Sequence, residues 1–429
     1  MLEGFFQVAD LAPSKIRIPL VAQCSSCGLF RNCQSPKMLV DGSGTRKILI
    51  IGEGPAKNED LQGRPFVGKA GQRIKSTLEK LSVDLRKNCW ITNAIICRAT
   101  KQSEKGNQVN RNPTDKEISF CRPNIIKTIN RFQPNVILLL GASAVKSVIG
   151  WLWKEEPGPM ERWRGWKIPC QKLNCFIVPT WHPSYIDRSQ DKMGRDNPVM
   201  NLIWKNDLEL AISVQSKPWK TVPDFRKQVK IIYDPREAAS AVRKMYLDSD
   251  VPIAFDFETE GLKPDNPELG IFSCSLSNGK ETISFPWHGD VITAVGEFLQ
   301  SDVPKIGYHI KFEYRWVREK MKFRVKNFIW DGMIAAHILD NRSGVTGLKF
   351  QSFVTLGQES YDDEIRSYLK ADNSNKMNRI REAPLDKLLL YGGMDSHLEW
   401  HVAQIQRKLL GFDYIKTEAT RLYRRCENG

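Results

Sequence analysis

The chain has 429 residues, of which 41% are hydrophobic and 26% charged, a composition that predicts two or three folded domains and excludes wholesale disorder. The formal net charge is +15, and residues 1–215 carry 32 lysines and arginines against 19 acidic residues, whereas residues 216–429 carry 32 against 30. A basic first half favours a polyanion such as nucleic acid. No apolar run approaches the roughly 20 residues of a membrane span and no secretory signal is evident, so we expect a cytoplasmic protein without membrane contact.

The first half of the chain alternates between short apolar runs and amphipathic stretches. The expected strands cover Lys47–Gly52, Cys89–Asn93, Asn135–Gly141 and Cys175–Pro179. The expected helices cover Ala70–Leu81 and Ile118–Phe132. Strands that alternate with helices predict an α/β fold with a doubly wound, mostly parallel sheet. Its binding loops should lie at the carboxyl ends of the strands.

A polar stretch with two prolines, within Ser213–Gln228, predicts a linker between two domains. We therefore place the domains at 1–215 and 229–429, with the linker at 216–228. The second domain should begin with strands at Val229–Tyr233 and Ile253–Phe257, separated by a helix at Pro235–Leu247, and should end in one or two helices over Leu385–Leu410.

Four cysteines stand out among the ten of the chain. Cys24 and Cys27 form a CxxC pair, and Cys97 and Cys121 lie far downstream, close to predicted regular elements. In an intracellular chain of this length such cysteines indicate metal ligation or buried thiols more than disulfides. Four thiolates can close a tetrahedral Zn²⁺ site or hold an iron–sulfur cluster, and their spacing alone does not separate the two.

Polar and aromatic residues follow the predicted strands of the first domain. Glu53, Gly54, Ala56 and Glu59 follow the first strand, and Phe66 lies in the glycine-rich segment after them. Asn93 closes the second strand, and His182 follows the fourth. Together with the four cysteines, these motifs resemble the iron–sulfur uracil-DNA glycosylases (family 4) over about residues 20–210.

That resemblance implies a role for each of these positions. Phe66 would stack on an extruded uracil, Asn93 would pair with its edge, and His182 would donate a hydrogen bond to the oxygen that gains charge. Glu53 and Glu59 would orient water and stabilise the cationic sugar, and Gly54 and Ala56 would contact the base. The cysteines Cys24, Cys27, Cys97 and Cys121 would hold a [4Fe–4S] cluster. The chain departs from the family at Ala56, where the family has glycine, and at the longer polar run 101–112.

Carboxylates gather in the second domain. Asp256 and Glu258 occupy alternate positions of a predicted strand, so both point to one face, and Tyr391 and Asp395 lie at i and i+4 of a predicted helix. His309 and Glu313 follow the strand-like segment Lys305–Gly307. Converging carboxylates are costly to bury unless cations join them, and two Mg²⁺ or Mn²⁺ ions would clamp the oxygens of a phosphodiester.

This order resembles the 3′–5′ proofreading exonuclease domain of family A DNA polymerases over about residues 229–410, which implies an RNase H-like mixed sheet. By that resemblance Asp256, Glu258, Glu313 and Asp395 hold the metals, Tyr391 orients the attacking water, and His309 contacts substrate. Glu313 stands where the family has aspartate, and His309 where it has asparagine.

Taken together, these motifs predict a DNA enzyme that handles uracil and trims 3′ ends. No polymerase motif follows, so the chain resembles the front portion of a phage-type family A polymerase, which would work in the host cytoplasm beside a polymerase domain or subunit. Its expected partner is DNA that is single-stranded, has free 3′ ends or contains uracil. Two alternatives stay open: a non-catalytic uracil-binding module that guides a polymerase, and a zinc-binding structural protein with a decayed nuclease.

Overall fold

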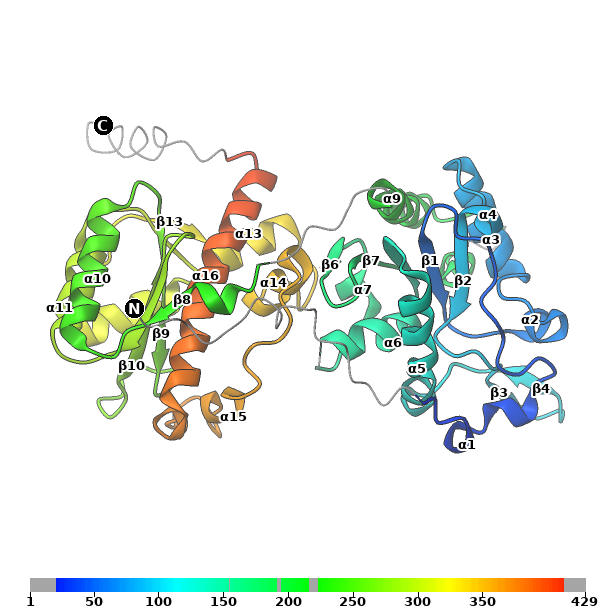
Figure 1. Ribbon diagram of the computed structural model, residues 1–429, viewed down its shortest axis with the longest axis horizontal. Coiled ribbons are helices and arrows are strands. Elements are labelled where there is room, and N and C mark those ends of the chain that lie inside the picture. The colour runs from blue at the N-terminus through cyan, green and yellow to red at the C-terminus, as the bar shows by residue number, and fades with distance from the viewer. Residues whose placement is uncertain (1–20, 154, 191–193, 216–222, 413–429) are drawn as a thin grey trace, which may run out of the picture. The chain divides into compact units, whose positions relative to one another are not determined.

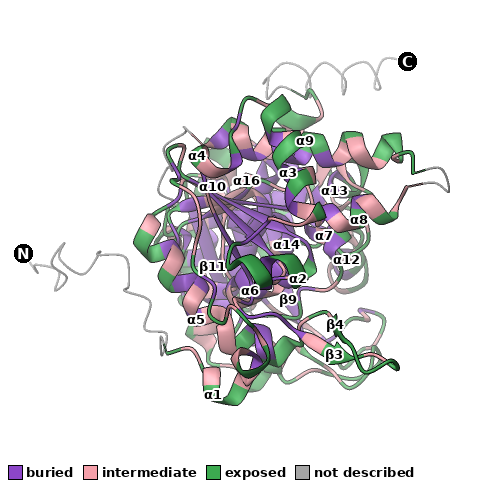
Figure 2. Ribbon diagram, turned by 90° about the vertical axis from the view of Figure 1, so that its right-hand side faces the viewer, coloured by how far each residue is buried: buried purple, intermediate pink, exposed green. Residues whose placement is uncertain are grey.

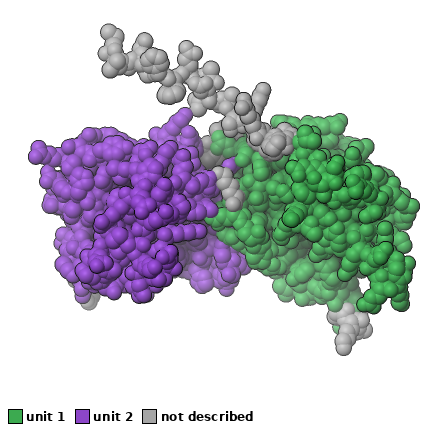
Figure 3. All heavy atoms as spheres, turned by 90° about the horizontal axis from the view of Figure 1, so that it is seen from below, with its two compact units in different colours: residues 1–221 green, residues 222–429 purple. Residues whose placement is uncertain are grey.

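The computed structural model describes residues 21–153, 155–190, 194–215 and 223–412. The chain forms two compact units, residues 1–221 and 222–429 (Figure 3), and each is described by itself. Most of the linker expected at 216–228 lies outside the described residues. No helix within the described ranges is both long enough and apolar enough to cross a membrane.

The first unit is built on a five-stranded sheet with the order β2-β1-β5-β7-β6 (Figure 1). Its strands are β1 Ile48–Gly52, β2 Cys89–Asn93, β5 Val136–Leu140, β6 Ile168–Cys170 and β7 Cys175–Thr180. Four of them run parallel, and β6 pairs antiparallel with β7 at one edge. Every residue of β1 and β5 is buried, which is the pattern of strands covered on both faces. The doubly wound, mostly parallel sheet expected from the sequence is confirmed.

The two helices expected in the first unit, at 70–81 and 118–132, correspond to α3 and α5, and seven further helices accompany them within the described residues. In chain order the helices are α1 Cys24–Cys27, α2 Lys57–Gln62, α3 Lys69–Lys80, α4 Leu85–Asn88, α5 Asp115–Phe132, α6 Ala142–Leu152, α7 Met160–Trp163, α8 Pro183–Arg188 and α9 Pro198–Val214, with a 3₁₀ turn at Leu29–Asn32. Helix α5 begins three residues earlier than expected because Thr114 and Glu117 form a capping box. The polar run 101–112 contributes to a hairpin that the sequence did not predict, with β3 Thr100–Gln102 and β4 Gln108–Asn110.

The second unit contains a mixed six-stranded sheet with the order β13-β12-β9-β10-β11-β8. Its strands are β8 Val229–Ile231, β9 Ile253–Thr259, β10 Ile271–Ser277, β11 Thr282–Pro286, β12 Lys305–Gly307 and β13 Phe328–Asp331. The central strands β9, β10 and β11 are antiparallel neighbours, whereas β12 runs parallel to β9. This is the RNase H-like mixed sheet that was expected.

The helices of the second unit include the long α16 over Leu385–Leu409, which is one continuous helix packed on β9, β10 and β11. The others are α10 Pro235–Asp248, α11 Asp290–Gln300, α12 Lys311–Trp316, α13 Gly332–Leu339, α14 Leu348–Leu356 and α15 Arg366–Leu369, with a π turn at Val317–Met321 and a 3₁₀ turn at Ile380–Glu382. Helices α10 and α11 pack together and share an apolar core with β9, β10 and β11. Figure 2 shows the buried residues gathered on the strands and on the helix faces turned toward them.

The expected linker is too long at its C-terminal end. Residues Phe225–Gln228 form a 3₁₀ turn, η3, and Phe225 is buried against Met394 and Leu398 of α16. The next residue, Val229, lies so close to Gly393 that a Cβ on that glycine would fall 2.3 Å from a Val229 methyl. A buried aromatic makes this segment part of the second unit, which polar composition alone did not indicate.

Candidate functional site

A cavity of about 580 Å³ opens at the carboxyl ends of the parallel strands in the first unit. The parallel register sets Gly52 of β1 beside Asn93 of β2, and Leu140 of β5 beside Thr180 of β7, so the loops that follow these strands meet there. Four residues singled out from the sequence line this cavity, namely Glu53, Gly54, Ala56 and His182. The hairpin borders it too, through Asn110 and the residues that follow.

His182 is held in a defined tautomer. It caps the N-terminus of α8, where its Nδ1 accepts a hydrogen bond from the Ser184 backbone N–H at 3.3 Å and lies 2.8 Å from Ser184 Oγ. Burial, with a smaller contribution from Arg188, lowers the pKa of His182 to about 4. The ring is therefore neutral near pH 7, and because Nδ1 is the acceptor, its proton is on Nε2.

Glu53 supplies an acid to the same cavity. Burial raises the pKa of its carboxyl group, and the positive charge of Arg188 opposes that rise. Arg188 also lines the cavity, and its guanidinium donates to Ser184 Oγ at 3.2 Å. Glu53, Arg188 and His182 therefore form one electrostatically linked group around the cavity.

Phe66 and Asn93 lie together behind the cavity wall. Both are nearly fully buried, and neither belongs to the residues that line the cavity. They converge on Gly52, where a Cβ would lie 2.5 Å from both Asn93 Oδ1 and Phe66 Cζ, so only glycine permits this approach. Phe66 has a φ of 57°, a left-handed conformation that is rare for an aromatic residue and typical of functional sites.

Glu59 is placed differently from the other predicted residues. Its Oε1 accepts from the Gly68 backbone N–H at 2.7 Å and its Oε2 from the Ala56 N–H at 3.2 Å, so it ties two loops together outside the cavity lining. Ala56 has a φ of −95°, which alanine adopts without strain. Its amide therefore points to Glu59, while the residue itself forms part of the cavity wall.

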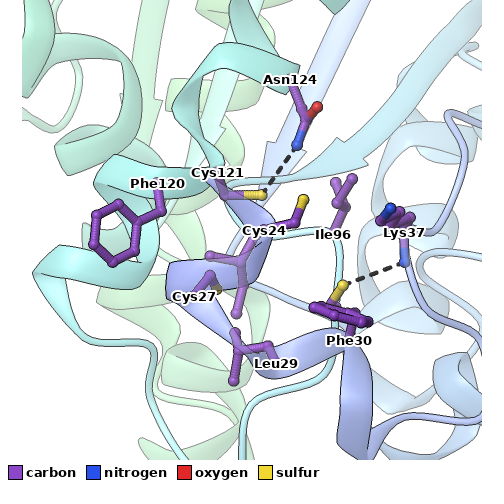
Figure 4. A pocket seen from close by; sticks show the side chains of 11 residues that line it. Cys24, Cys27, Leu29, Phe30, Lys37, Ile96, Phe120, Cys121 and Asn124 are labelled. Carbon is purple, nitrogen blue, oxygen red and sulfur yellow. Dashed lines mark hydrogen bonds between the residues drawn. The ribbon is translucent and has the colours of Figure 1, made fainter. Parts of the chain in front are cut away.

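The four predicted cysteines surround one small cavity of about 20 Å³ (Figure 4). Cys24 and Cys27 come from α1, Cys121 from α5, and Cys97 from the segment after β2. The Lys37 backbone N–H donates to Cys97 Sγ at 3.2 Å, and Asn124 Nδ2 donates to Cys121 Sγ at 3.6 Å. Cys33, which the sequence reasoning did not single out, packs beside this group.

The thiols need a positive partner to ionise. Burial raises the pKa of Cys97 to about 12, and burial also raises the pKa values of Cys27 and Cys121. A thiolate is the form that binds metal, so metal binding at this site would have to offset the loss of hydration.

The second unit holds an acidic site between β9 and α16. Ligand oxygens of Asp256, Glu258 and Asp395 lie within 4.8 Å of one another, the one such group among the residues that the structure describes. Burial and the neighbouring carboxylates raise the pKa values of Asp256 and Glu258 well above the ordinary value. Helix α16 packs against this strand, since a Cβ at Gly392 would make an ordinary van der Waals contact of 3.5 Å with Glu258 Cγ.

The other predicted residues of the acidic site lie around this trio. Glu313, in α12, is 3% exposed and adds to the negative charge at Glu258, but it is not one of the three close ligands. Tyr391 is buried on α16, one turn before Asp395. His309 is exposed in the loop between β12 and α12, with a φ of 64°, and its backbone N–H donates to Asp331 Oδ1 at 3.1 Å.

Two residues of this site were missed from the sequence. The Tyr361 hydroxyl donates to Asp395 Oδ1, and its ring stacks on Tyr391 with centroids 5.7 Å apart. Lys349 places its Nζ 5.2 Å from the Tyr391 ring centroid and forms an ion pair with Asp362 at 2.5 Å. No sequence signal connected Tyr361 with Asp395.

Comparisons with known proteins match both units. Residues 40–206 match the uracil DNA glycosylase superfamily, and residues 229–410 match a 3′–5′ exonuclease family. A type-4 uracil-DNA glycosylase of Thermotoga maritima is 30% identical over 201 residues, which are 46% of this chain and 92% of that protein. A DNA polymerase of Bacillus phage SP01 is 23% identical over 340 residues, and this chain covers 34% of that protein.

Among solved structures, the chain aligns with Escherichia coli RNase D at a TM-score of 0.31 and 15% identity, over 45% of this chain and 49% of that one. The glycosylase match covers nearly all of a type-4 relative, and the exonuclease match covers the sheet and α16 of the second unit. The chain thus belongs to the uracil-DNA glycosylase superfamily through its first unit, with type-4 enzymes among its relatives, and its second unit matches a 3′–5′ exonuclease family.

Proposed function

We propose that the first unit removes uracil from DNA by cleaving the bond between base and sugar. The observation that carries this proposal is the state of His182, a neutral ring whose Nδ1 is occupied by the Ser184 amide and whose Nε2–H is left for a ligand in the cavity. A neutral imidazole placed at the oxygen that gains charge stabilises the departing base by donating its Nε2–H as a hydrogen bond.

Other residues, in the cavity lining and close to it, would complete this chemistry. Glu53, beside Arg188, would orient water and stabilise positive charge on the sugar. Asn93 would pair with the uracil edge and Phe66 would stack on its ring, and the approach of both to Gly52 supports a shared role. Glu59 acts in this scheme as a positioning residue, since its two oxygens hold the loops at Ala56 and Gly68.

We infer that the four cysteines hold a [4Fe–4S] cluster. A single Zn²⁺ bound by four cysteines would bring their sulfur atoms to about 3.8 Å of one another. Within the described chain no three cysteine sulfurs lie within 4.8 Å of one another, and the support for a cluster is that all four cysteines line one cavity in a domain related to type-4 glycosylases. Cluster-loaded protein purified without air should absorb light at about 400 nm. A colourless protein that contains zinc would contradict this assignment.

The second unit is proposed to digest DNA from the 3′ end with two divalent cations. Asp256, Glu258 and Asp395 would hold one cation, and Glu313 would contribute to the second. Such cations stabilise charge on the attacking and leaving oxygens when bound. Tyr391 would orient the attacking water from the helix turn before Asp395, and Tyr361 would fix that carboxylate through its hydroxyl.

A second candidate function is uracil recognition without excision, which would let the chain guide or stall a polymerase. Ala56 is the observation that favours it, because this residue lines the cavity and its backbone N–H already donates to Glu59. The similarity to a phage DNA polymerase supports a place beside a polymerase in a phage-infected cell. The excess of basic residues in 1–215 supports binding to DNA that weakens as salt rises.

The deciding experiment uses a 5′-labelled single strand with one central uracil, incubated with cluster-loaded protein in EDTA and then treated with alkali. EDTA silences the nuclease, so only base removal can give a break. A single cut at the uracil is expected, and Asn93→Ala should reduce it and weaken discrimination against cytosine. An intact strand would refute excision, and retained tight binding to the uracil strand would then favour the recognition function.

A further inference from the structure

Helix α16 presents a second acidic residue on the face that carries Tyr391 and Asp395. Glu399 lies one turn beyond Asp395, at the i+4 position, so the three side chains follow one another along the helix. Glu399 is 3% exposed. Glu399 is not among the residues that the sequence motifs singled out.

The charges around Glu399 place it at the acidic site. After burial, the groups that raise its pKa are all carboxylates, namely Asp256, Glu313, Asp395 and Asp331. Its Oε2 is buried and has no hydrogen-bond partner in the described part of the chain. This carboxylate is therefore enclosed by like charge, and one of its two oxygens has no donor among the described residues.

Glu313 shows the same two properties. It is 3% exposed, and its Oε2 is also buried without a partner among the described residues. Asp256 is the first charge, after burial, that raises its pKa. The acidic site thus divides into the close trio of Asp256, Glu258 and Asp395 and an outer pair, Glu313 and Glu399, which faces the trio at Asp256.

Burying an unpaired carboxylate costs several kcal/mol unless a cation compensates it. Lys349 lowers the pKa of Asp395 against the effect of burial, but its Nζ is already paired with Asp362 at 2.5 Å. The two unpartnered oxygens of the outer pair are hard ligands of the kind that Mg²⁺ and Mn²⁺ prefer.

We propose that Glu399 is a further metal-ligating residue, which joins Glu313 and Asp256 around the second divalent cation of the exonuclease site. Ligand oxygens of Asp256, Glu313 and Glu399 do not all lie within 4.8 Å of one another, so we expect water to complete the coordination, as is usual for Mg²⁺. The inference rests on the proposed exonuclease function and specifies which side chains hold its second ion.

The test measures Mn²⁺ binding to the full, cluster-loaded chain without DNA, by calorimetry and by the electron paramagnetic resonance signal of free Mn²⁺. The unaltered protein should bind two ions. Glu399→Gln should retain the tighter ion and bind the second at least tenfold more weakly. Asp395→Asn should instead lose the tighter ion. Asp386 is exposed in the first turn of the same helix, and Asp386→Asn should leave the affinity for both ions unchanged.

The outcomes separate the inference from the function on which it rests. Equal binding of both ions by Glu399→Gln and the unaltered protein would overturn the role of Glu399 while leaving the metal site in place. An unaltered chain that binds no Mn²⁺ would overturn the proposed exonuclease function and the inference with it. If Glu399→Gln does not fold, Glu399→Asp, which withdraws the carboxylate by one methylene, should show the same selective loss. Retention of both affinities there would also overturn the inference.

Discussion

The neutral state of His182 makes a sharp prediction about acid pH. An ordinary histidine, with a pKa of 6.5, is only about one tenth neutral at pH 5.5. With its pKa lowered to about 4 by burial, His182 stays almost fully neutral there. The shift of about 2.5 pH units corresponds to about 3 kcal/mol in favour of the neutral ring. Base removal that depends on His182 should therefore change little between pH 7.5 and 5.5.

The measurement requires one precaution, because Glu53 also titrates in the cavity with a raised pKa. Single-turnover excision from a uracil-containing strand is therefore followed in EDTA with the Glu53→Gln variant, whose remaining pH dependence no longer includes this acid. We expect the slow residual rate to stay within about twofold from pH 7.5 to pH 5.5. A roughly tenfold fall in this rate that is absent from the Glu53→Gln, His182→Asn double variant would show that His182 has an ordinary pKa. That result would refute the argument that burial lowers its pKa.

Three further predictions follow from the two sites and the core. Asp256→Asn should abolish metal-dependent digestion while base removal in EDTA is unchanged, and loss of both activities would contradict two separate sites. Gly52→Ala should reduce excision at least tenfold, because the new methyl would meet Asn93 and Phe66 at 2.5 Å, and an unchanged rate would contradict their placement. Ile50→Ala, at a fully buried position of β1, should lower the free energy of unfolding of the first unit by about 2–5 kcal/mol, measured in urea from the loss of cluster absorbance.

The fold was predictable where local pattern and environment agree. The apolar runs of β1 and β5 are buried on both faces, so composition alone identified them. Strand β10 was missed because its alternate residues Ser273, Ser275 and Ser277 are polar yet buried. The Ser275 hydroxyl donates to the Gly392 carbonyl of α16 at 2.7 Å, and that partner is invisible in the local sequence.

The site residues that were predictable from the sequence are likewise those whose arrangement follows from local spacing. Asp256 and Glu258 share a strand face and Tyr391 and Asp395 a helix face, so spacing alone brought each pair together. Tyr361 could not be found, since it lies 34 residues before Asp395 and reaches it only through the tertiary fold. Glu53 lines the cavity and Glu59 holds two loops together outside it. This difference likewise depends on loop geometry, which the six-residue spacing between the two glutamates does not specify.

The first residues of the second unit limit where a separately expressed fragment of that unit can begin. Phe225 fills a space against Met394 and Leu398, on the helix that carries Asp395, and Val229 lies against Gly393. A truncation that begins at the helix α10, after residue 234, would remove both contacts and uncover the edge of β11, to which β8 is paired. An exonuclease fragment intended for separate expression should therefore begin no later than residue 223, even though the matched family begins at residue 229.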